Sequence, residues 1–503
     1  MLKKPILQQN DFVGGLVTKG PELSLQLNQT PDCLNVYSDI FKKLMRRNGY
    51  NKLNSISASA TGGGIYNYVR TEGEQYMISL FDGALKKMDI VNNTWDGILD
   101  PVSANANGTA LSDSIMHNVS FNGDCIIFTE SRDVPQKYDP NDNSGQYTDL
   151  HYGGSGTAPS TKIPFVWHNR VWALNTSSNP DRFYRSADSD HTSWDSLDYD
   201  EIVTSGDVGL TGVGSLRGRM YIFKKWSIHR ITYLGGSPLL DIRPTKSSIG
   251  TLSHRSIVNI EIPGKGEVLL FLGSDLQIYI FDGYNATPIS ENISTSNSIS
   301  NYCLIGDGST YGLNYNQLSK VHSVNYSRKH WCIMFFCLGD DTTPQDAFVY
   351  NYYTGAFWPF HFGHSFVDSC ISDNGTGQNK TYIIGDNYIW LFDDGNDDDG
   401  IAIEGYWVSS KLDIGVEVQY VKIYEHILNT ASNASTPLFY YRYNYETNWS
   451  SATVLAASTN EHPINISITE KIYQWKIYDN SSSAAFELIR SAIIVEQKGI
   501  GVT

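Results

Sequence analysis

Short apolar segments alternate with polar turns along most of this chain. A polar turn followed at once by a short apolar strand recurs seven times, and the first apolar residues of these strands are Tyr76, Cys125, Val171, Met220, Val268, Trp331 and Tyr382. The successive intervals are 49, 46, 49, 48, 63 and 51 residues. A period of about 45 to 50 residues holding about four hairpin-linked strands is typical of a propeller blade. We therefore predict one β-propeller of six or seven blades over residues 61–400, with a strand at each position.

The composition of each repeat favours strands over helices. Several strands are followed by a turn that begins with an aromatic residue and Asp or Asn, and the next strand often contains an aromatic residue, as in "IFDGYNATPI" and "VYNYYTGAFW". Strands rich in β-branched and aromatic residues and cut by Asp-Gly or Asn-Gly are hairpin signals. No window keeps the i, i+3, i+4, i+7 spacing for three helical turns. The prediction is an all-β protein.

The pattern changes after residue 400. The run "DDGNDDDG" (393–400) precedes longer strands that alternate with period two: "IAIEGYWVSS", "VEVQYVKIYEHI", "TPLFYYRYNYE", "HPINISITE", "KIYQWKIYD" and "AAFELIRSAIIVEQK". Six such strands within about 100 residues predict a C-terminal β-sandwich. The chain thus divides into an N-terminal arm with entry strands (1–60), a propeller (61–400) and a sandwich (401–503).

Four positive charges, Lys42, Lys43, Arg46 and Arg47, stand within six residues in "FKKLMRR". As a helix the segment would place Phe41, Leu44 and Met45 on one face, but Asn48-Gly49 directly afterwards also fits a strand that ends in a turn. We favour the strand, and expect these charges to lie in the strand and turn that feed the first blade or to pair with acidic neighbours.

In the N-terminal arm, residues 1–30, apolar and polar residues alternate only weakly, so we expect the arm to pack away from the propeller core.

The charge balance bears on DNA binding. Lysine plus arginine total 37 and aspartate plus glutamate total 53, a net charge of −16. Such a surface repels polyanions, which argues against a sequence-reading DNA-binding protein.

The six cysteines lack zinc-ligand spacing and are expected to be buried free thiols in a reducing cytosol. No segment approaches about 18 consecutive apolar residues and no apolar leader follows the basic N-terminus, so we expect neither a membrane span nor secretion.

Three segments imitate known sites. The run 393–400 has the oxygen ligands of a calcium loop but neither its order nor its closing Glu, so we expect a solvated interdomain loop. His361 and His364 lack a Cys or carboxylate in metal-ligand register and are expected to be strand and turn histidines. "RSADSDHTSW" (185–194) resembles the Asp-box of sialidase-type propellers, which is a folding turn.

An enzyme of this architecture needs paired carboxylates, or a tyrosine nucleophile facing arginines, at the propeller centre. Asp188, Asp207, Glu267 and Arg217 are candidates, but no spacing singles them out. "GGG" (62–64) precedes a strand and not a helix, so a phosphate cradle is not expected, and no other catalytic motif stands in context. We expect no catalytic residue, no metal ligand and no cofactor: the chain is predicted not to be an enzyme.

The order of features resembles that of a family of bacteriophage tail proteins. The stretch "FVGGLVTKGPELSLQLNQTPDCLNVYSDIFKKLMRRNGYNKLNS" has a Gly-Gly-Leu arm, a Pro-Asp-x-Leu-Asn-Val strand and an Arg-x-Gly-Tyr entry. The segments "RFYRSADSDHTSW", "FKKWSIHRITYLGGSPLLDIRPTKSSIGTLSHRSIVNI" and "LGSDLQIYIFDGYNATPIS" are similar to later blades of these proteins. The family is the tail hub or nozzle protein of short-tailed phages, also called the packaged-DNA stabilisation protein.

The resemblance implies a virion tail protein that is made in the host bacterial cytoplasm. Six copies would form a ring below the portal and its adaptor, the head-tail connector. The ring would extend the channel for genomic double-stranded DNA without sequence-specific binding, retain the packaged genome and carry fibre, spike or needle proteins. The family has no catalytic residues to transfer. The alternatives are a propeller glycan hydrolase or depolymerase and a tail adhesin that binds host glycans.

Overall fold

The computed structural model describes residues 6–53, 62–70, 73–89, 99–112, 115–207, 209–296, 299–307, 309–373, 378–414, 421–431, 435–457 and 459–497. Strands dominate these residues. The helical segments among them are short 3-10 turns: η1 (Glu22–Ser24), η2 (Asn143–Gly145), η3 (His254–Ser256), η4 (Glu291–Ile293), η5 (Tyr315–Lys320) and η6 (Ser327–Lys329). None of the described helices is long and apolar enough to cross a membrane.

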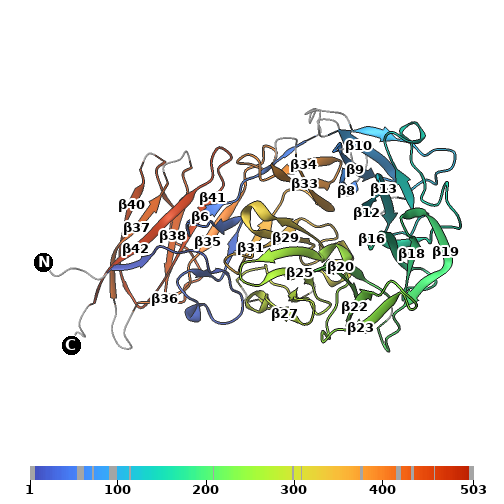
Figure 1. Cartoon of the computed structure of the whole chain (residues 1–503). Coiled ribbons are helices and arrows are strands. Elements are labelled where there is room, and N and C mark those ends of the chain that lie inside the picture. The colour runs from blue at the N-terminus through green and yellow to red at the C-terminus, as the bar shows by residue number, and fades with distance from the viewer. Residues whose placement is uncertain are drawn as a thin grey trace.

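A propeller and a sandwich lie side by side (Figure 1). The propeller has seven four-stranded antiparallel sheets. The first four blades are β8 (Gly62–Val69), β9 (Gln75–Phe81), β10 (Ala84–Asp89), β11 (Asp100–Val102); β12 (Met116–Phe121), β13 (Asp124–Thr129), β14 (Gln136–Tyr138), β15 (Thr148–Asp149); β16 (Thr161–Trp167), β17 (Arg170–Thr176), β18 (Arg182–Ala187), β19 (Asp190–Glu201); and β20 (Gly212–Leu216), β21 (Arg219–Phe223), β22 (Ile228–Tyr233), β23 (Leu240–Pro244).

The last three blades complete the ring. They are β24 (Val258–Ile262), β25 (Gly266–Leu272), β26 (Ile278–Phe281), β27 (Ala286–Pro288); β28 (His322–Tyr326), β29 (Trp331–Phe336), β30 (Asp346–Asn351), β31 (Ala356–His361); and β32 (Asp368–Asp373), β33 (Asn379–Gly385), β34 (Tyr388–Phe392), β7 (Tyr50–Lys52). The first strands of neighbouring blades contact one another all the way round, and β32 of the seventh blade contacts β8 of the first. The predicted propeller is confirmed, with seven blades.

All seven strand positions predicted from the repeat are confirmed. Each lies in the second strand of a blade: β9, β13, β17, β21, β25, β29 or β33. These strands are covered by a neighbouring blade on each face, so they read as continuous apolar runs; every residue of β29, for example, is buried. The long 63-residue interval falls where η4 and η5 lie in the connection between the fifth and sixth blades.

The sandwich consists of two sheets. One has the order β40 (Glu461–Glu470), β37 (Val421–Thr430), β42 (Glu487–Gln497), β6 (Leu44–Arg46), β5 (Val36–Ser38), with β1 (Ile6–Gln9) also paired to β42. The other has the order β39 (Thr453–Val454), β38 (Leu438–Tyr443), β41 (Ile472–Asp479), β35 (Gly405–Val408), β4 (Cys33–Leu34), with β36 (Leu412–Asp413) also paired to β41. Each of the six C-terminal segments predicted from period-two alternation contains a strand.

The N-terminal segment is not a separate arm, which corrects the predicted boundary at residue 60. Its strands β1, β4, β5 and β6 belong to the sandwich, and β7 is the outer strand of the seventh blade. "FKKLMRR" supplies β6, so the strand prediction is confirmed, but the segment leads into the last blade and not the first. Two- and three-residue strands have too little pattern of their own to reveal such distant partners.

The expectation that residues 1–30 pack away from the propeller is wrong for residues 15–19. The ring of Phe12 lies 5.5 Å from that of Trp407 in the sandwich, but Leu16 is buried and the backbone N–H of Thr18 donates to the carbonyl of Asn292, 2.8 Å away, beside the fifth blade. β2 (Gly15–Leu16) pairs in parallel with β3 (Gln29–Thr30) and lies against β31. The apolar residues of the arm are isolated in sequence, so their burial leaves no periodic signal.

Close approach of the first two blades predicts sensitivity at Gly64. A Cβ at this position would lie 2.5 Å from the Cβ of Met116 and 3.2 Å from its backbone. We expect Gly64→Ala to lower the free energy of unfolding by about 1–3 kcal/mol, because a contact this close forces one of the two strands to shift. Gly236→Ala is the control, since no atom lies within 4 Å of its added Cβ. Equal denaturant midpoints for the two variants would contradict this packing.

Candidate functional site

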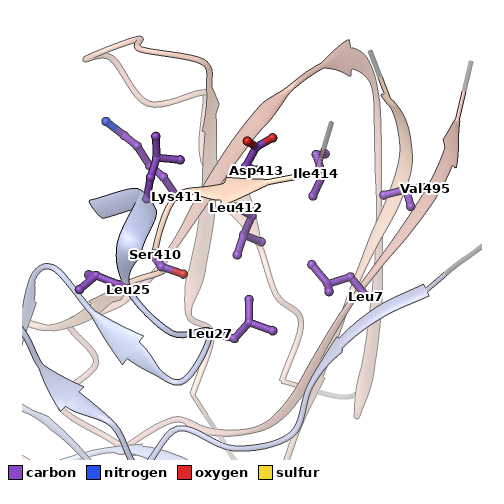
Figure 2. A pocket seen from close by; sticks show the side chains of 10 residues that line it. Leu7, Leu25, Leu27, Ser410, Lys411, Leu412, Asp413, Ile414 and Val495 are labelled. Atoms are coloured by element: carbon purple, nitrogen blue, oxygen red, sulfur yellow. The ribbon is translucent and has the colours of Figure 1, made fainter. Parts of the chain in front are cut away.

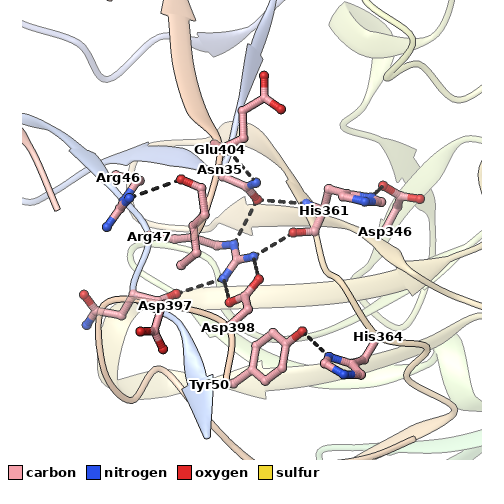
Figure 3. A network of polar contacts seen from close by, with 12 residues as sticks. Asn35, Arg46, Arg47, Tyr50, Asp346, His361, His364, Asp397, Asp398 and Glu404 are labelled. Atoms are coloured by element: carbon pink, nitrogen blue, oxygen red, sulfur yellow. Dashed lines mark hydrogen bonds and ion pairs between the residues drawn. The ribbon is translucent and has the colours of Figure 1, made fainter. Parts of the chain in front are cut away.

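The junction between propeller and sandwich is built by the segment with four positive charges (Figure 3). The chain passes from β4 in one sandwich sheet to β5 and β6 in the other, and then to β7 in the seventh blade. Asn35 makes the first crossing with a left-handed φ of 53°, which Asn tolerates better than most residues. Its amide Nδ2 donates to the carbonyl of Glu404 over 2.8 Å, and its Oδ1 accepts from the backbone N–H of His361 over 2.9 Å.

Arg47 is the centre of this junction, and 1% of its surface is exposed. Its guanidinium donates to both carboxylate oxygens of Asp398, over 2.8 and 2.6 Å. The same group donates to Oδ1 of Asn35 over 2.9 Å and to the carbonyl of His361 over 2.7 Å. A bidentate pair with further partners offsets the cost of burying two charges. Arg47 therefore joins the sandwich hairpin, the sixth blade and the 393–400 loop.

Arg46 is equally buried and points the other way. It forms an ion pair with Asp479 of β41 at 3.1 Å and donates to the carbonyls of Ile403 and Asn396 over 3.1 and 2.9 Å. Burial lowers the pKa of Arg46 and raises the pKa of Asp479, which reflects the cost of taking both charges out of water. Arg46 thus fixes the same loop against the sandwich.

The remaining charges of the cluster pair near the surface. Lys42 lies 2.8 Å from Asp11, and Lys43 lies 3.3 Å from Glu487. The predicted pairing of this cluster with acidic neighbours is therefore confirmed for Lys42 and Lys43. The burial of Arg46 and Arg47 was not predicted.

The acidic run is part of the same junction and not the solvated loop expected from its composition. Asp398 is 4% exposed and holds Arg47, whereas Asp393 accepts from Lys329 over 2.6 Å and Asp399 pairs with Lys52 at 2.8 Å. Gly49 lies so close to the loop that a Cβ there would stand 1.5 Å from the carbonyl oxygen of Asp397.

The propeller axis holds a second polar cluster. His117 of β12, Lys162 of β16 and Glu130 after β13 meet, with Glu130 accepting from Lys162 over 2.7 Å and lying 3.2 Å from Nε2 of His117. Burial opposes ionisation of Glu130, but the hydrogen bond from His117 and the charge of Lys162 lower its pKa to about 2. The carboxylate is therefore ionised and already paired.

The turn η3 crosses the axis and connects further blades. The ring of His254 lies 5.6 Å from that of His117. Arg255 donates to the carbonyl of Val367 over 2.6 Å and to that of Lys320 over 3.3 Å, and it lies 3.6 Å from Asp368. Asp368 in turn accepts from the backbone N–H of Ile65 over 3.1 Å. These contacts tie the blades together across the centre, and each carboxylate has a cationic partner.

The four carboxylate and arginine candidates named from the sequence do not form one site. Asp188 accepts from Asn169 over 3.0 Å, and Asp207 accepts from the backbone N–H groups of Lys225 and Trp226, each over 3.1 Å. Arg217 and Glu267 do meet, since the backbone N–H of Arg217 donates to Glu267 over 3.0 Å. Each group is used in a local turn or blade contact.

The predicted turn and strand roles hold for the other candidates. Asp190 of the Asp-box-like segment accepts from Thr192, and hydrogen bonds from Ser193 and Thr192 lower its pKa to about 2. His361 pairs with Asp346 and His364 with the hydroxyl of Tyr50, each over 2.8 Å.

No group of three or more possible metal ligands occurs within the described ranges. The six cysteines are free, and Cys370 is the one that is not fully buried.

An apolar groove lies where the arm meets the sandwich (Figure 2). It has a volume of about 450 Å³ and is lined mainly by leucines and other aliphatic residues: Leu7, Leu23, Leu25, Leu27, Leu412, Ile414 and Val495. Leu23 and Leu27 are 43% and 38% exposed.

The axial residues were missed by sequence reasoning. His117, Arg255 and Asp368 stand in different repeats with no common spacing, and they meet because the ring closes. What they share is a position in, or just before, the first strand of a blade, and this can be recognised only after the blades have been placed.

No protein-family model matches the chain, and no curated protein matches it. Solved structures similar to it include PorZ, a bacterial surface component of the type-IX secretion system of Porphyromonas gingivalis, with 10% identity over 74% of this chain and 44% of that one, and a TM-score of 0.39. Another is the WD40 domain of Toxoplasma gondii coronin, with 10% identity over 72% and 87% of the two chains and a TM-score of 0.38. The chain thus spans less than half the length of PorZ, and the propeller assignment stands on the strand pairings themselves.

The buried ion pair at the junction generates one prediction. Asp398→Asn removes the charge that balances Arg47, so we expect a loss of about 3–5 kcal/mol in the free energy of unfolding. Asp11→Asn is the matched control, because its partner Lys42 is 57% exposed, and it should cost less than about 1 kcal/mol. Urea unfolding of both variants measures the difference. Similar losses would mean that Arg47 does not depend on Asp398.

The axial cluster predicts a pH dependence. Burial, followed by the neighbouring His117, lowers the pKa of His254 from 6.5 to about 3. Between these values the unfolded chain binds a proton that the folded protein does not, so this contribution to stability is complete above pH 6.5 and is lost as the pH falls. In wild type the free energy of unfolding should fall more steeply from pH 7 to 4 than in His254→Asn, by at most about 1.4 kcal/mol per pH unit. Identical slopes would contradict a neutral His254.

Proposed function

We propose that this chain is a structural virion protein, the subunit of a tail hub or nozzle ring in a short-tailed bacteriophage. About six copies extend the DNA channel below the portal and adaptor, retain the packaged genome and carry the tail appendages. The assignment rests on the resemblance described above, and the structure adds a reason for the residues that carry it.

The observation that supports this proposal most is the role of the N-terminal pattern. Its Gly-Gly pair packs against neighbouring backbone, since a Cβ on Gly15 would lie 2.8 Å from Phe357. Asn35 of the Asn-Val element binds Arg47 of the Arg-x-Gly-Tyr element. The residues of this pattern therefore form the joint between the propeller and the sandwich. A rigid joint fixes the relative position of these two units, as a ring requires if the propeller and the sandwich each contact different neighbours.

The axis of the propeller bears on where DNA passes. Because η3 and its ion pairs occupy the centre of the blades, a duplex does not run through one propeller. In the proposed ring the channel lies between copies. Six copies of charge −16 give −96, and an acidic wall lets a duplex slide because it does not neutralise phosphates.

The mass of the purified protein tests the ring. Six copies of 56.2 kDa give about 337 kDa, and we expect native mass spectrometry to find this closed assembly and negative-stain images to show a ring with a central opening. The same material should not retain duplex DNA near 0.15 M salt. A monomer that releases sugars from bacterial polysaccharide would instead support the glycan hydrolase. Tight, salt-sensitive DNA binding would contradict the passive channel.

A further inference from the structure

We propose that the sandwich carries a binding site for a neutral glycan, independent of the ring. The site is a surface hollow of about 490 Å³ formed by the second half of β38 and the turn after it. Four aromatic and four polar residues line this aromatic hollow: Tyr441, Tyr443, Tyr445, Trp449, Glu446, Thr447, Asn448 and Ser450. The aromatic side chain at its rim is largely open to solvent: Tyr445 is 74% exposed, and its ring contacts the protein through Nζ of Lys411, 5.7 Å from the ring centre.

The turn that forms the hollow is held in place by hydrogen bonds. The backbone N–H of Tyr441 donates to Oγ of Ser450 over 3.0 Å, and the N–H of Ser450 donates back to the carbonyl of Tyr441 over 2.8 Å. Asn444, with a left-handed φ of 53°, donates through Nδ2 to Glu470 over 2.6 Å. The aromatic rings therefore stand on a fixed scaffold, which limits the entropy lost on binding.

Arg442 sets the orientation of Trp449. Its guanidinium carbon lies 4.4 Å from the centre of the indole ring, while its Nε donates to Gln474 over 2.7 Å and its Nη1 to the carbonyl of Thr447 over 3.3 Å. One face of Trp449 is thus fixed against the protein. The polar side chains of Thr447 and Asn448 stand on the exposed rim of the same turn.

The charges around the hollow argue for a neutral ligand. The two nearby cations are both directed at Glu22 of η1: Lys411 lies 2.8 Å from it and Arg442 lies 3.8 Å from it. Glu446 adds an exposed carboxylate to the lining. A phosphate or nucleic-acid site needs uncommitted Arg or Lys side chains, and this hollow offers none among its described lining residues.

A sugar ring matches the remaining chemistry. Tyr and Trp present an apolar face for the C–H side of a pyranose and a polar edge for its hydroxyls. The amide of Asn448 and the hydroxyl of Thr447, both exposed, supply donors and acceptors. A few well-placed polar groups beside aromatic faces are the usual composition of a specific small-ligand site.

Affinity electrophoresis tests this proposal with dextran, galactan and mannan as neutral probes and alginate and polygalacturonate as anionic ones. Wild type should be retarded by at least one neutral polysaccharide. Tyr445→Ala should weaken that retardation at least tenfold, and Asn448→Ala should weaken it as well; both change exposed side chains. Tyr353→Ala is the matched control, since this tyrosine is 59% exposed on the sixth blade, and should behave as wild type.

The outcomes separate this site from the ring. No retardation of wild type by the neutral probes, retardation by the anionic probes alone, or equal retardation of Tyr445→Ala and wild type would overturn the glycan site. A change in native mass caused by Tyr445→Ala would identify the hollow as a subunit contact and would also overturn it. Glycan binding by a protein that stays monomeric would support the hollow while contradicting the proposed ring.

Discussion

The buried pair between Arg47 and Asp398 is the interaction on which the arrangement of the molecule depends. Removing two charges from water costs several kcal/mol, and the cost is tolerable because the guanidinium also binds Asn35, Asn48 and His361. These partners belong to the sandwich crossing, the entry to β7 and the sixth blade. One side chain therefore joins the N-terminal crossing to His361 and Asp398, which lie 314 and 351 residues further along the chain.

The joint also completes the seventh blade. β7 is the outer strand of the seventh blade. The chain reaches it from the end of β6 in the sandwich, at Arg46, through the short segment that contains Arg47 and Gly49. The ring closes through the first strands β32 and β8, and the junction holds β7 in the seventh blade while β5 and β6 stay in the sandwich sheet. Closure of the ring then brings the axial residues of separate blades together. The strand β38, whose second half lines the aromatic hollow, lies in the sandwich and away from the blades (Figure 1).

The sequence predicted best the elements whose pattern is local. β29 reads as an unbroken buried run and β40 alternates residue by residue, so both were placed from their own residues. The short strands β4, β6 and β7 pair with strands hundreds of residues away, and nothing in two or three residues encodes such a partner. Asp398 was expected in solvent because a charged, Gly-broken run is usually solvated, but its environment is set by Arg47, 351 residues earlier. The axial cluster was invisible for the same reason.

Native-state hydrogen exchange gives the most direct test of the central claim, that the junction makes propeller and sandwich one cooperative unit. The account predicts that the slowest amides of β33 in the propeller and of β41 in the sandwich exchange with the same free energy of opening, since neither unit persists without the strands that join them. If the amides of β41 exchange through a separate opening of lower free energy while those of β33 stay protected, the two units are independent and the account is wrong.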